Sequence, residues 1–206
     1  MSSAGPQLTA AFLLTAGLAG AIVTCALPMW KVSAFVGNNI VTAQTFWEGL
    51  WMSCAFQSTG QMQCKLYDSA LALPRHLQAA RAMTVAAILL AAAGLPLAFA
   101  GGECTNCPEE KKARAAAAAG ALAAAAGALL LVPASWSAHD VVRDFYDPAL
   151  GDAQRRELGA ALFVGWASAG LLLIGGALLC RRRRRASPRD ASYSVKYSAA
   201  GGAAYV

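Results

Sequence analysis

The stretch LTAAFLLTAGLAGAIVTCALP (residues 8–28) contains no Asp, Glu, Lys, Arg or His. A helix that rises about 1.5 Å per residue needs roughly 20 apolar residues to cross a hydrocarbon core about 30 Å thick. This stretch therefore has the length and composition of a membrane span. Residues 82–101, 115–136 and 158–180 are equally free of charge. We expect four spans.

Two of these stretches allow another interpretation. The first resembles a secretory signal peptide, but no Lys or Arg precedes it, and it is longer than the usual apolar core of about 7–15 residues. The third begins with an almost unbroken alanine run over residues 115–126, so it is either a weak span or an exposed alanine-rich helix. Leucines at 129–131 strengthen its far end, and an even number of spans places both termini on one side.

Composition and charge narrow the class of protein. With 57% hydrophobic residues, 14% charged residues and a mean hydropathy of +0.46, the chain is too apolar for a soluble enzyme. The residues after Cys180 carry seven bases and one acid, a net charge of +6 that equals the charge of the whole chain. Because Lys and Arg mark cytoplasmic segments, we expect this tail to face anionic inner-leaflet lipid. Nucleic acid is not implied as a partner.

These boundaries give the organisation of the chain. In order they are a cytoplasmic N-terminus (1–7), a span (8–28), an outer loop (29–81), a span (82–101), a cytoplasmic loop (102–114), a span (115–136), an outer loop (137–157), a span (158–180) and a cytoplasmic tail (181–206). Small residues are frequent in the spans. They indicate either close helix packing in a compact bundle or a bias of composition.

The first outer loop changes from apolar runs to alternation of apolar and polar residues, which is typical of strands. We expect strands over residues 30–35, 40–45, 51–56 and 62–66, with a turn at residues 37–39 and a helix over residues 69–80.

Cys54 and Cys64 lie in this loop, where an oxidising compartment favours a disulfide over two free thiols. Closing this loop stabilises the fold by about 3 kcal/mol on the chain-entropy model.

The sequence gives little support for catalysis or for metal binding. His76 and His139 are isolated, no carboxylate lies within a span, and no catalytic group of residues is recognisable, so we expect neither an enzyme nor a cofactor. Cys104, Cys107 and Cys180 flank the expected spans on the cytoplasmic side, where they are either sites of S-palmitoylation or inert thiols. A single CxxC without a second ligand pair does not predict a metal site.

A set of signature residues resembles the claudin family: Trp30, Gly49, Leu50, Trp51, Cys54, Cys64 and Arg81. The stretches ALPMW (26–30), QSTGQMQCK (57–65) and QAARA (78–82) are similar to the subgroup that contains claudins three and four. The resemblance implies a left-handed four-helix transmembrane bundle with an extracellular antiparallel β-sheet formed mainly by the first outer loop. It further implies that Trp30 and residues 49–51 anchor this sheet near the membrane.

The resemblance also implies a function. Claudins polymerise in cis and pair in trans, forming paracellular barriers at tight junctions in the plasma membranes of epithelial or endothelial cells. Lys65 matches a position where an acidic residue favours cations in pore-forming members, so we expect a barrier to cations. Lys31 adds to this positive field, whereas Glu48 and Asp68 oppose it. The alternative is that Lys65 is a solvated side chain without such a role.

Assembly and partners follow from the same resemblance. Phe145, Tyr146 and Leu158 match assembly positions, with Ala70 as a smaller partner than the family usually has. Residues 147–150 (DPAL) depart from the Asn-Pro-Leu-Val type of claudins that bind clostridial enterotoxin, which leaves this partner open. The terminal Tyr205 and Val206 resemble ends that PDZ domains of zonula occludens scaffold proteins recognise. The rival class is another four-span relative, acting as an adhesion protein or as an auxiliary receptor or channel subunit.

Overall fold

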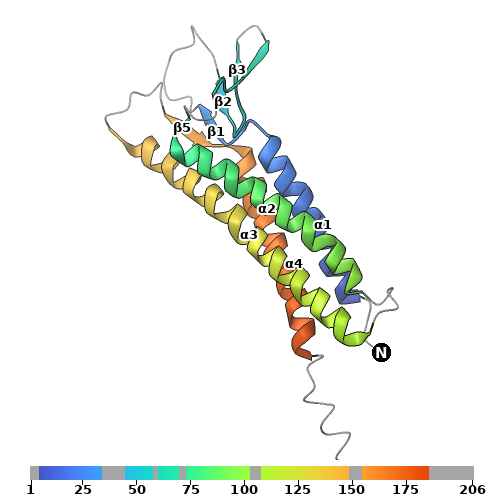
Figure 1. Ribbon diagram of the computed structural model, residues 1–206. Helices are drawn as coiled ribbons and strands as arrows, with labels where there is room; N and C mark the ends of the chain where they lie inside the picture. The colour runs from blue at the N-terminus through green and yellow to red at the C-terminus, as the bar shows by residue number, and fades with distance from the viewer. Residues whose placement is uncertain are drawn as a thin grey trace, which may run out of the picture.

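The computed structural model describes residues 5–33, 45–57, 60–69, 73–102, 108–148 and 155–185. Four helices form an elongated bundle (Figure 1): α1 (Gly5–Ala26), α2 (Arg75–Ala100), α3 (Glu109–Tyr146) and α4 (Ala160–Arg185). All four are long and apolar enough to cross a membrane. The start of α1 and the end of α4 lie at one end of the bundle, and the strands lie at the other. This arrangement agrees with an even number of crossings.

Close packing of small side chains brings the helices together. Along the middle of the bundle, Ala21 of α1, Ala87 and Ala91 of α2, Ala126 of α3 and Ala169 of α4 are buried in one cluster. At Gly120 of α3, an added Cβ would lie 2.7 Å from the backbone oxygen of Gly176 on α4. Only glycine allows the two backbones to approach so closely, as is common where helices associate in lipid.

The alanine run forms part of α3 and packs inside the bundle. Ala119, Ala123 and Ala126 are completely buried, and Ala116 is nearly so. Alanine has the highest helix propensity, and its small side chain lets α3 lie close to both α2 and α4. The alternative of an exposed alanine-rich helix is therefore wrong.

The second outer loop differs from the sequence-based expectation in two ways. First, α3 continues to Tyr146, so a large part of the expected loop over residues 137–157 is helical. Burial of Ala138 and Val141, which continue the helical spacing of the buried Ala134, stabilises this extension. Second, Leu158 does not begin the last helix, because it belongs to the strand β5 (Arg156–Leu158), which the sequence did not predict.

A five-stranded antiparallel sheet lies at one end of the bundle. The other strands are β1 (Lys31–Ser33), β2 (Thr45–Glu48), β3 (Met52–Phe56) and β4 (Met62–Leu66), and the order across the sheet is β4-β3-β2-β1-β5. The prediction for β4 is confirmed, and that for β3 holds to within one residue. Strand β2 covers residues 46–48, where none was predicted, whereas residues 40–44 lie outside the described part. Of the helix expected over residues 69–80, only the part from Arg75 onward is helical among the described residues.

The predicted disulfide between Cys54 and Cys64 is present, and it joins directly opposed residues of β3 and β4. Every side chain of β4 is exposed, so this edge strand has almost no apolar core of its own. Its position therefore depends on backbone pairing with β3 and on the covalent link.

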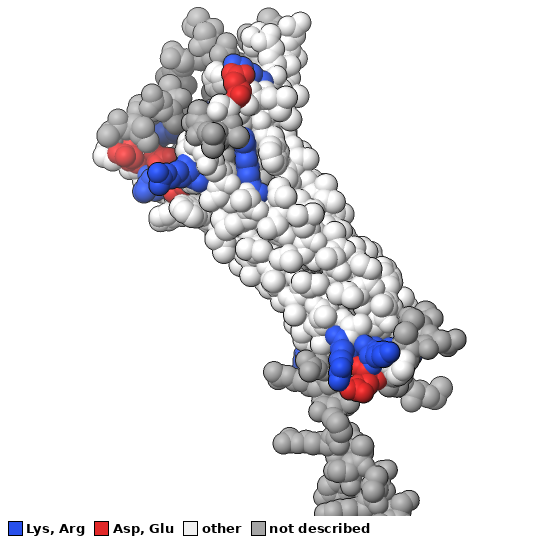
Figure 2. Space-filling model, viewed as in Figure 1, with Lys and Arg blue, Asp and Glu red and all other residues white. Residues whose placement is uncertain are grey.

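The charged side chains are separated from the apolar middle of the molecule. Figure 2 shows Lys, Arg, Asp and Glu at the two ends of the bundle, with a long uncharged zone between them. This zone fits a hydrocarbon layer that excludes unpaired charge. The expected architecture of four membrane-spanning helices and an antiparallel sheet is thus confirmed.

Candidate functional site: the charged face of the β-sheet

Trp30 and Leu50 connect the sheet to the bundle. Both are buried, and they share a core cluster with Ala134 of α3 and Leu162 of α4. The indole N–H of Trp30 donates a hydrogen bond of 2.8 Å to the backbone oxygen of Thr24, at the end of α1. Trp30 and Leu50 therefore pack between the strands and the helices and connect the two parts of the fold. Trp30 is not a lipid-exposed anchor, since only 3% of its surface is accessible.

Arg81 holds the neighbouring signature residues from α2. Its Nε donates a hydrogen bond of 2.5 Å to the backbone oxygen of Leu50. Its guanidinium carbon lies 4.9 Å from the ring centroid of Trp51 and 5.4 Å from that of Tyr67. The indole N–H of Trp51 in turn donates to the sulfur of Cys25 at 3.3 Å. One half-buried arginine thus fixes the loop between β2 and β3.

Replacing Arg81 with lysine should destabilise the protein, although the charge is kept. Lysine lacks the planar guanidinium that donates to Leu50 and lies over two rings, so we expect a loss of about 2 kcal/mol. The thermal unfolding midpoint of the detergent-solubilised protein should fall by roughly 5 °C. Arg75→Lys, at the exposed start of the same helix, is the matched control. Equal midpoints for the two variants would contradict the role of Arg81.

Tyr67 follows β4 and connects it back to the base of the sheet. Its hydroxyl donates a hydrogen bond of 3.3 Å to the backbone oxygen of Gly49. Burial raises the pKa of the Tyr67 phenol above its usual value of 10.0, the charge of Glu48 raises the pKa further, and Arg81 lowers it. The phenol therefore stays protonated at neutral pH and remains a donor.

One row of directly opposed residues crosses the sheet from edge to edge. The register aligns Lys65 of β4, Ser53 of β3, Glu48 of β2, Lys31 of β1 and Leu158 of β5. Directly opposed residues of antiparallel strands point to the same face, and Arg156, two residues before Leu158, points there as well. We call these six residues the charged face. It brings together Lys65 and Lys31, the two lysines that the sequence singled out.

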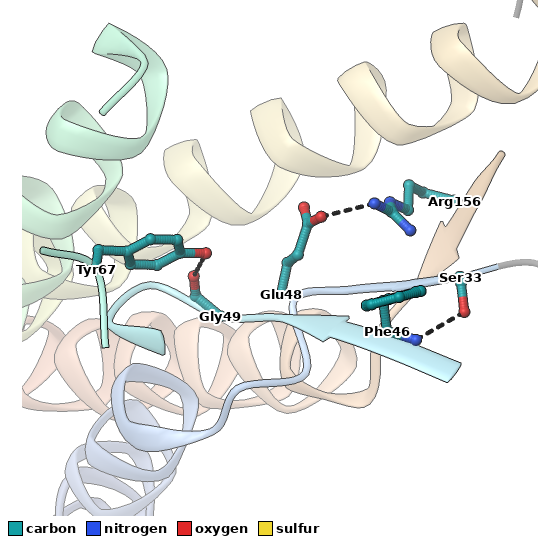
Figure 3. Close-up of polar contacts among 6 residues, drawn as sticks. All are labelled: Ser33, Phe46, Glu48, Gly49, Tyr67 and Arg156. Carbon is teal, nitrogen blue, oxygen red and sulfur yellow. Dashed lines mark hydrogen bonds and ion pairs between the residues drawn. The ribbon is translucent and has the colours of Figure 1, made fainter. Parts of the chain in front are cut away.

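The bases of the charged face have different partners. Arg156 forms an ion pair with Glu48, which lies two strands away, and the distance from the guanidinium nitrogen to the carboxylate oxygen is 2.8 Å (Figure 3). Lys65 pairs at 2.7 Å with Asp68, and both side chains are about three-quarters exposed. Lys31 has no acidic partner in the part of the chain that the structure describes. The hydrogen bond and the charge of Asp68 raise the pKa of the Lys65 ammonium above 10.5, so Lys65 stays charged at physiological pH.

Part of the charged face lines a hollow near the start of α2. This hollow has a volume of about 540 Å³. Lys31, Glu48 and Ser53 contribute to its wall from the strands, together with Asp68, and His76 contributes from α2. The charged groups border only part of the hollow, and most of its wall is apolar, because its other lining residues include Trp30, Leu73, Pro74 and Leu77.

The assembly residues expected in the second outer segment lie in different surroundings. Phe145 and Tyr146, at the end of α3, form an edge-to-face pair with ring centroids 5.4 Å apart, and Tyr146 is 78% exposed. Leu158 instead packs against the core cluster at the base of the sheet. Ala70 lies outside the described residues.

Of the residues that the sequence assigns to the cytoplasmic side, only some lie within the described ranges. The sulfur of Cys180 lies beside Gly120, where an added Cβ would come within 2.7 Å of it, so the thiol faces α3. Cys104, Cys107, Tyr205 and Val206 lie outside the described residues. Within the described ranges, no three His, Cys, Asp or Glu side chains gather where they could hold a metal ion.

Three residues of the site were not found by sequence reasoning. Cys25, Tyr67 and Arg156 each contact a signature or charged residue from another segment. The partners Glu48 and Arg156 are 108 residues apart in sequence. No local pattern marks such a pair, because it exists only once β1 lies between β2 and β5.

Four apolar helices and a disulfide-bonded sheet at one end of the bundle are the features of a four-span membrane protein. A family model described as PMP-22/EMP/MP20/Claudin matches residues 4–179. The chain belongs to this family.

Similar proteins narrow the class further. The chain is 59% identical over 201 residues to a claudin-like protein, ZF-A89, of Danio rerio, covering 97% of this chain and 96% of that one. It is 53% identical to human claudin-4 over 207 residues (99% and 98%) and 54% identical to human claudin-3 over 202 residues (96% and 90%). These relatives support a multi-pass membrane protein with a general role at tight junctions, and they agree with the resemblance noted in the sequence.

Proposed function

We propose that this chain polymerises within the plasma membrane of an epithelial or endothelial cell and pairs with copies or other claudins on the adjacent cell. The resulting strands form a paracellular barrier that restricts cations. The main observation behind this proposal is the excess of positive charge on the charged face. This face carries three bases, Lys31, Lys65 and Arg156, and one acid, Glu48. Its support comes also from the 53–59% identity to claudins.

Fixed positive charge acts on ions when the aqueous path beside it is narrow. A basic side chain raises the free energy of a passing cation and lowers that of an anion. Both lysines belong to the sheet, and Lys65 is on its exposed edge strand. We assign Lys65 the main role and Lys31 a supporting one, because the half-buried Lys31 lies farther inside the sheet.

Assembly and anchoring use other residues. Exposed Tyr146 and the neighbouring Phe145 offer aromatic contact area to a second copy. We retain Leu158 and Ala70 as the remaining members of this contact, with Leu158 acting from within the sheet. Trp30, residues 49–51 and Arg81 serve to hold the sheet at the membrane surface.

Cytoplasmic partners complete the proposal. Tyr205 and Val206 bind a PDZ domain of a zonula occludens scaffold protein by adding a strand to its sheet. The basic residues 181–185 contact anionic inner-leaflet lipid. Cys104, Cys107 and Cys180 are the candidates for S-palmitoylation. We make no proposal for clostridial enterotoxin.

The family model also covers proteins of the PMP-22, EMP and MP20 type. Freeze-fracture can distinguish a strand-forming claudin from another four-span relative. The test uses cells that lack junction strands and are transfected with this chain. We expect strands at cell contacts. Contacts without strands would instead favour an adhesion protein or an auxiliary subunit.

Reversing the charge of Lys65 tests the ion selectivity. In Lys65→Asp, a negative charge replaces a positive one, so the permeability of Na⁺ relative to Cl⁻ should rise by roughly tenfold. The measurement is the dilution potential across an epithelial monolayer. Arg143→Asp, an exposed base at the end of α3, is the matched control and should leave the ratio unchanged. An unaltered ratio in Lys65→Asp would remove Lys65 from the selectivity mechanism.

A further inference from the structure

Lys65 and Asp68 form a local pair at the edge of the sheet. The distance from the Lys65 ammonium nitrogen to a carboxylate oxygen of Asp68 is 2.7 Å, and the residues are three apart in sequence. Exposed pairs of this kind add little to folding stability, because water screens them. Such a pair can nevertheless affect a passing ion, because the free energy of that ion depends on the net charge near its path.

The chain itself keeps the two charges close. Three residues span at most about 11 Å even when fully extended, and the Debye length at physiological ionic strength is about 8 Å. In the closed pair, at 2.7 Å, Asp68 lies well within one Debye length and cancels much of the field of Lys65. From a distance beyond the pair, Lys65 and Asp68 act as a dipole rather than as a single positive charge.

Glu48, the single acid of the charged face, is paired with a base other than Lys65. Glu48 pairs with Arg156 at 2.8 Å, on the side of the sheet away from β4. Its negative charge is thus largely compensated by a base of another strand. Among the described residues, Asp68 is the acid in direct contact with Lys65.

We infer that Asp68 is a specificity-determining residue, which weakens the restriction of cations and the anion preference set by Lys65. This inference rests on the proposed role of Lys65 in a paracellular path. It predicts that selectivity follows the sum of the two charges rather than the presence of lysine alone.

Four full-length chains, expressed at matched junctional levels in an epithelial monolayer, test this inference through dilution potentials. Compared with the unmodified chain, Lys65→Gln should raise the Na⁺/Cl⁻ permeability ratio about threefold, because Asp68 is left alone. Asp68→Asn should lower the ratio about threefold, because Lys65 is left alone. The double variant Lys65→Gln/Asp68→Asn should return to the ratio of the unmodified chain. All these side chains are exposed, so folding should be preserved.

Glu157→Gln is the matched control. It also removes one acid, but Glu157 lies on β5, opposite Val32, and points to the other face of the sheet. Four strand spacings separate β5 from β4, roughly 19 Å along the sheet, which exceeds two Debye lengths. We expect no change in the ratio. A decrease equal to that in Asp68→Asn would overturn the assignment to Asp68.

The outcomes separate the two proposals. If Lys65→Gln shifts the ratio while Asp68→Asn does not, and the double variant equals Lys65→Gln, the inference about Asp68 is wrong and the role of Lys65 stands. If neither single variant shifts the ratio, the role of Lys65 itself is wrong. Only opposite shifts that cancel in the double variant support the charge pair.

Discussion

Trp30→Ala is expected to lower the free energy of unfolding by about 3–5 kcal/mol, the largest loss that we expect for a single side chain of this protein. Trp30 is almost completely buried between the sheet, α3 and α4, so its removal leaves a cavity that the rigid helices cannot fill. The backbone oxygen of Thr24 also loses its indole donor. The measurement is the thermal unfolding midpoint in detergent micelles, which should fall by roughly 10 °C.

A second tryptophan provides the control. Trp136 of α3 is 50% exposed and lies outside the three buried clusters, so Trp136→Ala should shift the midpoint far less. Trp30→Phe should fall between the two, because it keeps most of the apolar volume but not the hydrogen bond. A midpoint for Trp30→Ala that matched Trp136→Ala would refute Trp30 as the connection between sheet and bundle.

Removing the disulfide should release β4 while the helices remain folded. In Cys54→Ser/Cys64→Ser, the hairpin loses about 3 kcal/mol of stabilisation. Since all five side chains of β4 are exposed, no apolar packing compensates for this loss. Hydrogen–deuterium exchange should show the amides of β3 and β4 exchanging roughly 100-fold faster, with α3 and α4 unchanged.

Cys180→Ser controls for the loss of sulfur alone. Cys180 lies beside α3 at the opposite end of the bundle from the sheet, so exchange in β4 should be unaffected. Unchanged protection of β4 in the double serine variant would mean that backbone pairing with β3 suffices.

The sequence predicts the helices more reliably than the outer segments. A charge-free run that lies in lipid must be helical, because each unpaired backbone group there costs several kcal/mol. The strands β3 and β4 are marked by alternation and by two cysteines. Strand β5 carries no such mark, as three residues are too few for a period, and it forms because β1 offers an open edge.

The end of α3 is another feature that the sequence alone did not predict correctly. A hydropathy criterion ends the span at Trp136, where polar residues begin. The helix nevertheless continues to Tyr146, because Ala138 and Val141 find buried contacts beyond the apolar run. Membrane solvation sets the minimum length of a helix, and packing against the sheet sets where it ends.

By itself, the sequence determined the four apolar helices, the disulfide and the signature residues. These depend on composition and spacing within short stretches, which the bilayer and the redox environment act on directly. Only the tertiary structure decided which charges meet, since Glu48 and Arg156 are joined across β1 and Lys65, Glu48 and Lys31 are aligned by register. Electrostatic interaction falls off with distance in space, and distance in space is fixed by strand order rather than by position in the chain.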